Sequence, residues 1–104
     1  MDLWIEHDGA LHPRGMICDA CGTRSFPVAA HCRRCGDKGV RAIALSRTGT
    51  IETWTAGDGN AFGDVRLDDG MLTFGRLEPA ANLAMGLPVH FAPSDVMRFV
   101  AAQS

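Results

Sequence analysis

The stretch CDACGTRSFPVAAHCRRCG, residues 18–36, contains two C-x-x-C pairs separated by ten residues, and a glycine follows each pair. Two cysteines with two residues between them can turn both sulfurs toward one ion. The following glycine lets the backbone curl so that its N–H groups face the thiolates. Two such turns make a closed tetrahedral site for one structural zinc ion. The predicted metal ligands are Cys18, Cys21, Cys32 and Cys35.

Ligation by four thiolates indicates a structural role, because a catalytic zinc keeps one position open for water or substrate. Iron in the same cage is the main metal alternative, since tetrahedral thiolate sites accept both ions. Redox dithiols and accidental pairing are the other readings of two close cysteine pairs. His31, next to Cys32, is expected to be a bystander or to donate a hydrogen bond to the site, because four thiolates already complete it.

The chain is short, so a metal site is expected to contribute to the stability of its fold. With 104 residues there is room for one ordinary domain or two very small ones, which bury a poor fraction of their surface. A structural zinc site contributes roughly 10–16 kcal/mol of apparent binding energy, enough to fold a segment with little core. Acidic residues near the N-terminus and the lack of a long apolar run argue against a secretory signal or a membrane span. We therefore expect a cytoplasmic protein with reduced cysteines and no membrane partner.

The formal net charge is only -2, but the charges are unevenly distributed. Residues 14–47 hold most of the cations, and residues 48–104 hold mostly carboxylates. This change of sign near residue 47 is one indication of a domain boundary. The cations of the first segment are Arg14, Arg24, Arg33, Arg34, Lys38, Arg41 and Arg47, and the carboxylates of the second are Glu52, Asp58, Asp64, Asp68, Asp69, Glu78 and Asp95.

After residue 39 the pattern changes to short strands separated by turns. Asp68-Asp69-Gly70 is a strong hairpin signal, and Glu78–Met85, with Gly86 just beyond it, predicts one helical turn. Five or six short strands with one small helical insertion are typical of a Greek-key barrel, of which the OB-fold is the common five-stranded form. The predicted strands are Val40–Ser46, Gly49–Ala56, Phe62–Leu67, Met71–Leu77, Leu87–Ala92 and Asp95–Ala101.

The sequence therefore predicts a small, mostly-β protein in which a rubredoxin-like zinc ribbon precedes a compact OB-fold-like β-barrel. The expected division is an N-terminal extension at residues 1–13, the ribbon at 14–40 and the barrel at 41–104. No phosphate loop, dinucleotide fingerprint or nucleophile with an adjacent base is present, so we predict no catalytic residues. Residues that bind an organic cofactor are not identified by any motif.

The chain resembles a family of zinc-ribbon/OB-fold proteins associated with acyl-CoA metabolism. The matching features are the knuckles CDACG and CRRCG with FP between them, the segment SRTGTIETWT, and VRLDDGMLTFGRLEP followed by MGLPVHF. The resemblance covers roughly residues 14–92. It implies an accessory subunit that forms a hetero-oligomer with a thiolase-like enzyme and helps to bind or present an acyl-CoA. The family often has a longer loop where this chain has only residues 57–60, which favours a compact structural subunit over a CoA-binding one.

Three functions compete on these grounds. The first is a non-catalytic partner of a thiolase-type enzyme that forms or cleaves C–C bonds of acyl-CoA substrates. The second is a nucleic-acid-binding module, supported by Arg33, Arg34 and a stacking residue, Trp54, and disfavoured by the acidic barrel. A stand-alone enzyme is the third and has no assembled acid-base pair behind it.

Overall fold

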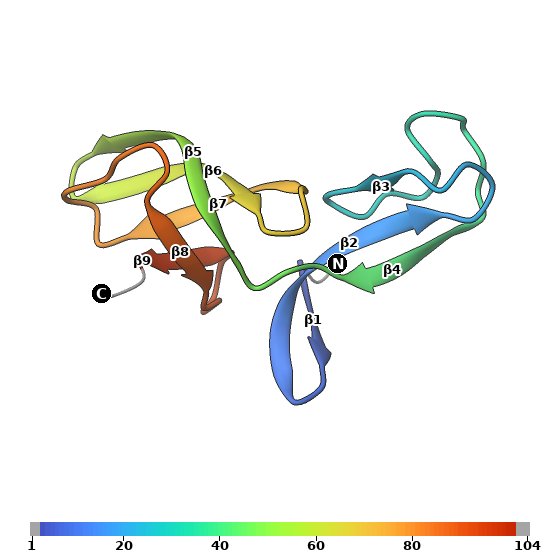
Figure 1. Cartoon of the computed structure of the whole chain (residues 1–104), viewed down its shortest axis with the longest axis horizontal. Helices are drawn as coiled ribbons and strands as arrows, with labels where there is room; N and C mark the ends of the chain where they lie inside the picture. Colours follow the sequence, from blue (N-terminus) through green and yellow to red (C-terminus); the bar gives the residue numbers. More distant parts are fainter. Residues whose placement is uncertain (1–2, 102–104) are drawn as a thin grey trace.

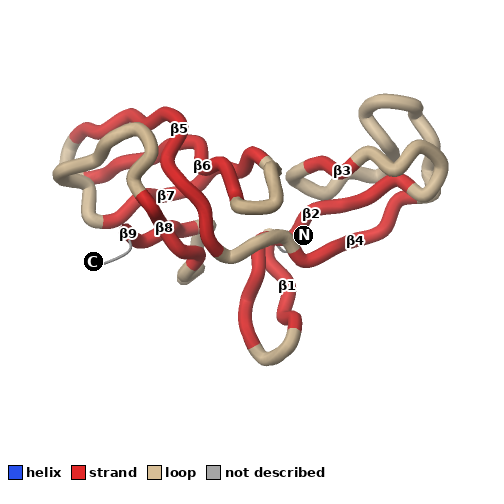
Figure 2. Tube along the Cα trace, viewed as in Figure 1, coloured by secondary structure: helices blue, strands red, loops and turns tan. Residues whose placement is uncertain are grey.

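The computed structural model describes residues 3–101, which form two β units connected through residues 45–47. Figure 1 shows the four-stranded ribbon sheet on one side and the closed barrel on the other. Within the described residues there is no helix, and so none that could cross a membrane, as the red strands and tan loops of Figure 2 show. The predicted mostly-β fold class is therefore confirmed. The strands are β1 (Trp4–His7), β2 (Ala10–Cys18), β3 (Arg24–Ser25), β4 (Val40–Ala44), β5 (Thr48–Gly57), β6 (Asn60–Leu67), β7 (Leu72–Glu78), β8 (Pro88–Phe91) and β9 (Arg98–Ala101).

Strand β2 is the spine of the ribbon sheet. Its first half pairs with β1, and its second half pairs with β3 on one side and β4 on the other, all antiparallel. Asp8 and Gly9 connect β1 to β2 with φ angles of 52° and 79°, as a two-residue hairpin turn requires. The N-terminal extension expected from the sequence is thus part of a hairpin whose second strand leads directly into the first cysteine knuckle.

The assignment of Val40–Ser46 to the barrel was wrong. In the structure Val40–Ala44 is β4, which pairs with β2 from Arg14↔Ala44 to Cys18↔Val40, so its hydrogen bonds are made within the ribbon sheet. The barrel closes with five strands and leaves no place for a sixth. The division at positions 13/14 and 40/41 stays a prediction, and β2 and β4 each lie across one of these positions.

The barrel closes in the order β5-β6-β7-β9-β8, with β8 returning to β5. Its hairpins are antiparallel, whereas β7 and β9 pair in parallel and complete the closure. The expected turns at residues 57–60 and at Asp68-Asp69-Gly70 connect β5 to β6 and β6 to β7, the first with only Asp58 and Gly59 between the strands. A register shift between Ile51 and Thr53 bends β5, which lets one long strand serve both ends of the barrel.

Apolar side chains that point inward at alternate positions of the barrel strands fill the barrel interior. Phe91 and Phe99 are fully buried, with ring centroids 5.3 Å apart. The only buried polar residue among those described is Thr73, whose hydroxyl donates to the carbonyl of Val65 over 3.2 Å. The core residues are Leu45, Ile51, Ala61, Val65, Leu67, Leu77, Val89, Phe91, Met97 and Phe99.

The helical turn predicted at Glu78–Met85 was also wrong. Glu78 is the last residue of β7, where it pairs with Val100 of β9. Asn82 has a φ of 63°, a left-handed conformation that cannot continue a right-handed helix. Leu83 packs against the barrel core, so the segment is a loop held by its apolar contacts.

Aromatic contacts and backbone hydrogen bonds join the two units. Trp4 of the ribbon meets Phe91 of the barrel edge-on at 6.5 Å, and Phe26 meets Phe74 at 5.5 Å. The guanidinium of Arg47 donates to the carbonyl of Leu11 over 2.8 Å and to that of Phe91 over 3.3 Å. One arginine between the two units therefore bonds to both.

Asp69, in the β6–β7 turn, makes a second connection. Its carboxylate accepts a hydrogen bond from the backbone N–H of Ser46 over 2.9 Å. Its carbonyl accepts another from the Arg24 side chain over 3.0 Å, which places the turn beside β3, as Figure 1 shows. Contacts on two sides thus set the ribbon's orientation against the barrel.

A substitution at Gly63 tests the tight packing of β5 on β6. A Cβ there would meet the carbonyl oxygen of Thr53 and lie 2.9 Å from Trp54 Cα, so backbone would have to move. We expect Gly63→Ala to lower the free energy of unfolding by about 1–3 kcal/mol in urea denaturation. Gly57→Ala is the matched control, because a Cβ at Gly57 has nothing within 4 Å, and it should change stability by less than about 0.5 kcal/mol. Equal stability of the two variants would contradict this packing.

Candidate metal centre

The two cysteine knuckles are built by the same backbone pattern. In the first, the N–H of Cys18 donates to Thr23 O over 2.9 Å and the N–H of Gly22 to Cys18 O over 2.8 Å. The second repeats both bonds from Cys32 to Asp37 O at 2.8 Å and from Gly36 to Cys32 O at 2.9 Å. Each glycine has a positive φ, 73° at position 22 and 79° at 36, which a residue with a Cβ rarely adopts. The glycine in each motif is therefore what closes the turn.

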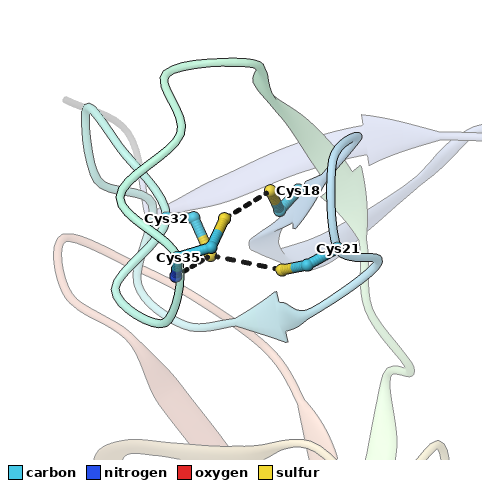
Figure 3. A group of neighbouring side chains, drawn as sticks. All are labelled: Cys18, Cys21, Cys32 and Cys35. Carbon is cyan, nitrogen blue, oxygen red and sulfur yellow. Dashed lines mark hydrogen bonds between the residues drawn. The ribbon is translucent and has the colours of Figure 1, made fainter.

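Four sulfurs meet where the knuckles face each other (Figure 3). Cys18 Sγ lies 3.6 Å from Cys35 Sγ, and Cys21 Sγ lies 3.7 Å from Cys32 Sγ. All four lie within 4.8 Å of one another. Tetrahedral zinc with Zn–S bonds of about 2.3 Å requires sulfurs about 3.8 Å apart. The structure thus brings the four predicted residues together with the spacing that one zinc ion needs.

Hydrogen bonds favour the ionised form of two of these thiols. The side chain of Thr23, 3.1 Å from Cys21 Sγ, lowers the pKa of Cys21 to about 6. The backbone N–H groups of Cys35 and Arg34, at 3.5 and 3.4 Å from Cys32 Sγ, lower the pKa of Cys32. Thiolates are the form that binds metal, so these bonds prepare the site for a cation.

Cys35 behaves differently. The backbone N–H of Asp37 favours its thiolate, but the Cys18 sulfur at 3.6 Å and the other two sulfurs outweigh that effect and raise the pKa of Cys35 to about 12. A further negative charge among close sulfurs is unfavourable without a compensating cation. A bound zinc ion supplies that compensation, because a coordinating thiol is deprotonated outright.

The site is half inside the ribbon and half at its surface. Cys18 and Cys32 are buried, whereas Cys21 and Cys35 are exposed. His31 is exposed and does not belong to this group, which in the described part of the chain is the one cluster of at least three potential ligands. Four thiolates complete a tetrahedral shell and leave no position for water or substrate.

Residues 14–41 match the family model described as "ChsH2, rubredoxin-like zinc ribbon domain". The N-terminal unit is a rubredoxin-like zinc ribbon. The match covers both cysteine knuckles and ends within β4. Four cysteines positioned to bind one metal ion are what such a ribbon needs for structural zinc, so the predicted cofactor agrees with both findings.

A solved structure described as "Ltp2-ChsH2(DUF35) aldolase" has a similar fold over most of both chains. The TM-score is 0.70 at 18% sequence identity, and the alignment covers 88% of this chain and 86% of that one. The ribbon and the barrel therefore occur together in a known fold, which confirms the arrangement of domains that the resemblance implied. No curated protein sequence matches the chain.

The barrel also carries an open groove, most of whose lining residues were not predicted from the sequence. Its aromatic lining comes from Trp54, Phe62 and Phe74, of which only Trp54 was noted from the sequence. The missed signal is alternation: Phe62 and Phe74 stand on the outer face of β6 and β7, where a small barrel normally places polar residues. Two exposed phenylalanines at such positions mark an unusual face.

Substitution of one ligand tests the metal centre. Cys35→Ser removes one thiolate of four, so we expect loss of stoichiometric zinc by elemental analysis and loss of the dispersed ribbon amide signals in an NMR spectrum. The barrel signals should persist, because the barrel has its own core.

His31→Ala is the control and should retain zinc and the ribbon signals, since the His31 side chain is outside the cluster. A Cys35→Ser protein with an ordered, metal-free ribbon would refute the structural role of the ion. Loss of zinc from the His31→Ala variant would show that His31 contributes to the metal site.

Proposed function

We propose that this chain is a non-catalytic accessory subunit that binds a thiolase-like enzyme acting on acyl-CoA substrates. The supporting observation is its likeness, ribbon and barrel together, to a chain described as "Ltp2-ChsH2(DUF35) aldolase". That description names two components, Ltp2 and ChsH2, and one activity, that of an aldolase. By analogy, this chain forms a hetero-oligomer in which the partner carries out formation or cleavage of a C–C bond.

The closed metal site supports a structural role for this subunit and a catalytic role for its partner. In this proposal Cys18, Cys21, Cys32 and Cys35 hold zinc as its four ligands, so the ion cannot polarise a substrate or activate a water. Its role is to fold the ribbon and to hold Phe26 and Trp4 against the barrel. The subunit then offers its partner a rigid surface, and its reduced cysteines fit the cytoplasm.

A contribution to acyl-CoA binding is secondary in this proposal. The connection between β5 and β6 is the two-residue turn Asp58-Gly59, so no long loop is available there to cover a nucleotide. The exposed cations of the second knuckle, Arg33, Arg34 and Lys38, are the groups best suited to meet a CoA phosphate. The main role of the chain is therefore structural.

The alternative function, nucleic-acid binding, has one observation in its favour. Trp54, Phe62 and Phe74 are exposed on the barrel, as stacking platforms for bases are. The charge of the barrel opposes it, because residues 48–101 hold three arginines against seven carboxylates. A polyanion would be repelled from that surface.

Co-expression with a thiolase-like enzyme from the same organism tests the proposal. We expect both chains to elute together in size-exclusion chromatography, and acyl-CoA turnover to require the enzyme subunit. A control column run of each chain alone gives the uncombined elution volumes.

Separate elution of the two chains, together with salt-sensitive binding of this chain to single-stranded DNA, would replace the proposal by the alternative.

A further inference from the structure

The groove on the barrel has a volume of about 370 Å³ and opens to solvent. Three large aromatic side chains around it are unusually exposed for a small domain: Trp54 by 39%, Phe62 by 57% and Phe74 by 49%. The other lining residues are Thr53, Thr55, Gly63, Asp64 and Gly75. An apolar surface of this kind on a protein usually meets a ligand or partner.

Strand register explains why these side chains gather. Phe62 and Asp64 are two residues apart on β6, so both point to the outer face. Asp64 lies opposite Phe74 on β7 and opposite Thr53 on β5. Gly63 pairs with Gly75 on β7 and with Trp54 on β5, so these three residues alternate to the opposite face from Phe62, Asp64 and Phe74, although they too line the groove. The groove is thus a consequence of the barrel's pairing and not of a mobile loop.

The ribbon holds one wall in place. Phe26, which lies between the two cysteine knuckles, packs edge-on against Phe74 with an interplanar angle of 67°. Such a pair restricts the ring of Phe74, so less order has to be gained on binding. The metal-folded unit therefore helps to shape a surface that lies on the other unit.

The charges around the groove select its occupant. Arg66 is paired with Glu52 at 3.2 Å. Arg76 shares Glu78 with Arg98, each at 3.4 Å, and also donates to the side chain of Asn60 over 2.7 Å, so both cations of this face are already engaged. Within the described residues Asp64 has no cationic partner in salt-bridge range and accepts only the Thr53 hydroxyl, at 3.1 Å. Aromatic rings and a carboxylate without a counter-ion attract a cation and repel an anion.

We propose that this groove binds an arginine side chain presented by the partner protein, an inference that rests on the accessory function proposed above. A guanidinium is planar, stacks on aromatic faces and pairs with a carboxylate, which fits the side chains of Phe62, Phe74 and Asp64 on one face of the barrel. The volume lies near the lower end of small-molecule pockets, about 300–1,000 Å³, and suits one side chain. Aromatic residues and arginine are also the residues enriched at the centres of protein interfaces.

An NMR titration of the zinc-loaded protein tests the chemistry directly. The probe is N-acetyl-arginine methylamide, and the neutral control is the citrulline analogue, which has nearly the same shape without the charge. We expect saturable shifts of the Phe62 and Phe74 ring signals with arginine and much weaker shifts with citrulline. Trp4 is an internal control, because it packs against Phe91 at the junction of the two units and does not line the groove.

The Asp64→Asn variant tests the role of the charge in this titration, since the amide keeps the contact with Thr53 but removes the negative charge. Arginine affinity should fall about tenfold or more, as expected for a lost charge-assisted contact of roughly 1.5–3 kcal/mol. Equal shifts with citrulline, equal shifts at Trp4 or an unchanged Asp64→Asn affinity would overturn the proposal. So would a stronger response of the Phe62 and Phe74 rings to an oligothymidylate than to arginine.

The complex with the enzyme subunit gives the second test. Asp64→Asn and Phe62→Ala should each raise the dissociation constant about tenfold or more, while zinc content stays unchanged. The matched controls are Asp95→Asn, which removes one carboxylate elsewhere on the barrel, and Met85→Ala, which truncates a side chain that is 75% exposed and outside the groove. Both controls should bind as the wild type does.

The two tests separate two kinds of failure. If the wild-type complex forms and the groove variants bind equally well, the arginine site is overturned and the accessory function stands. If the wild-type chain forms no complex, the accessory function and the partner's arginine fall together, and the titration alone decides whether the groove selects cations.

Discussion

The meeting of four cysteine sulfurs at one position is the constraint on which the ribbon depends. The cluster of buried apolar side chains lies mostly in the barrel and reaches the ribbon through Leu45 and partly buried neighbours such as Trp4 and Phe26. Without a core of its own, a sheet built on one long strand would be marginal in water. A metal ion that binds both knuckles supplies the missing cohesion, because it exists as a bound species only when the segment is folded.

This constraint reaches beyond the ribbon through two ring contacts. Trp4 on Phe91 and Phe26 on Phe74 tie the metal-dependent unit to the inside and the outside of the barrel. Arg47 and Asp69 add hydrogen bonds at the same junction. In the proposed complex the surface of this chain is composite: a cationic ribbon tip and an aromatic, acidic barrel face, held at a set angle. Charges of opposite sign at the two ends favour an oriented contact with one protein over binding to a uniform polyanion.

The errors of sequence interpretation have a common physical origin. Val40–Ala44 reads as a strand in any context, but whether it joins the barrel or β2 depends on partners far along the chain. Pro79 and Gly86 gave Glu78–Met85 the end signals of a helix, yet Leu83 finds its burial against the barrel and Asn82 turns left-handed. The overlooked hairpin of β1 and β2 had a local signal, the Asp8-Gly9 pair between two apolar runs.

Local chemistry explains what the sequence determined by itself: the cysteine knuckles with their glycines, the hairpin turns and the mostly-β class all arise from residues a few positions apart. Pairings between distant segments were decided only by the tertiary structure. These include β4 on β2, the parallel β7–β9 contact that closes the barrel, and the meeting of Phe62, Asp64 and Phe74 in one groove. A one-residue change of register would turn each of those side chains to the opposite face, and no local pattern fixes the register between strands joined across a barrel.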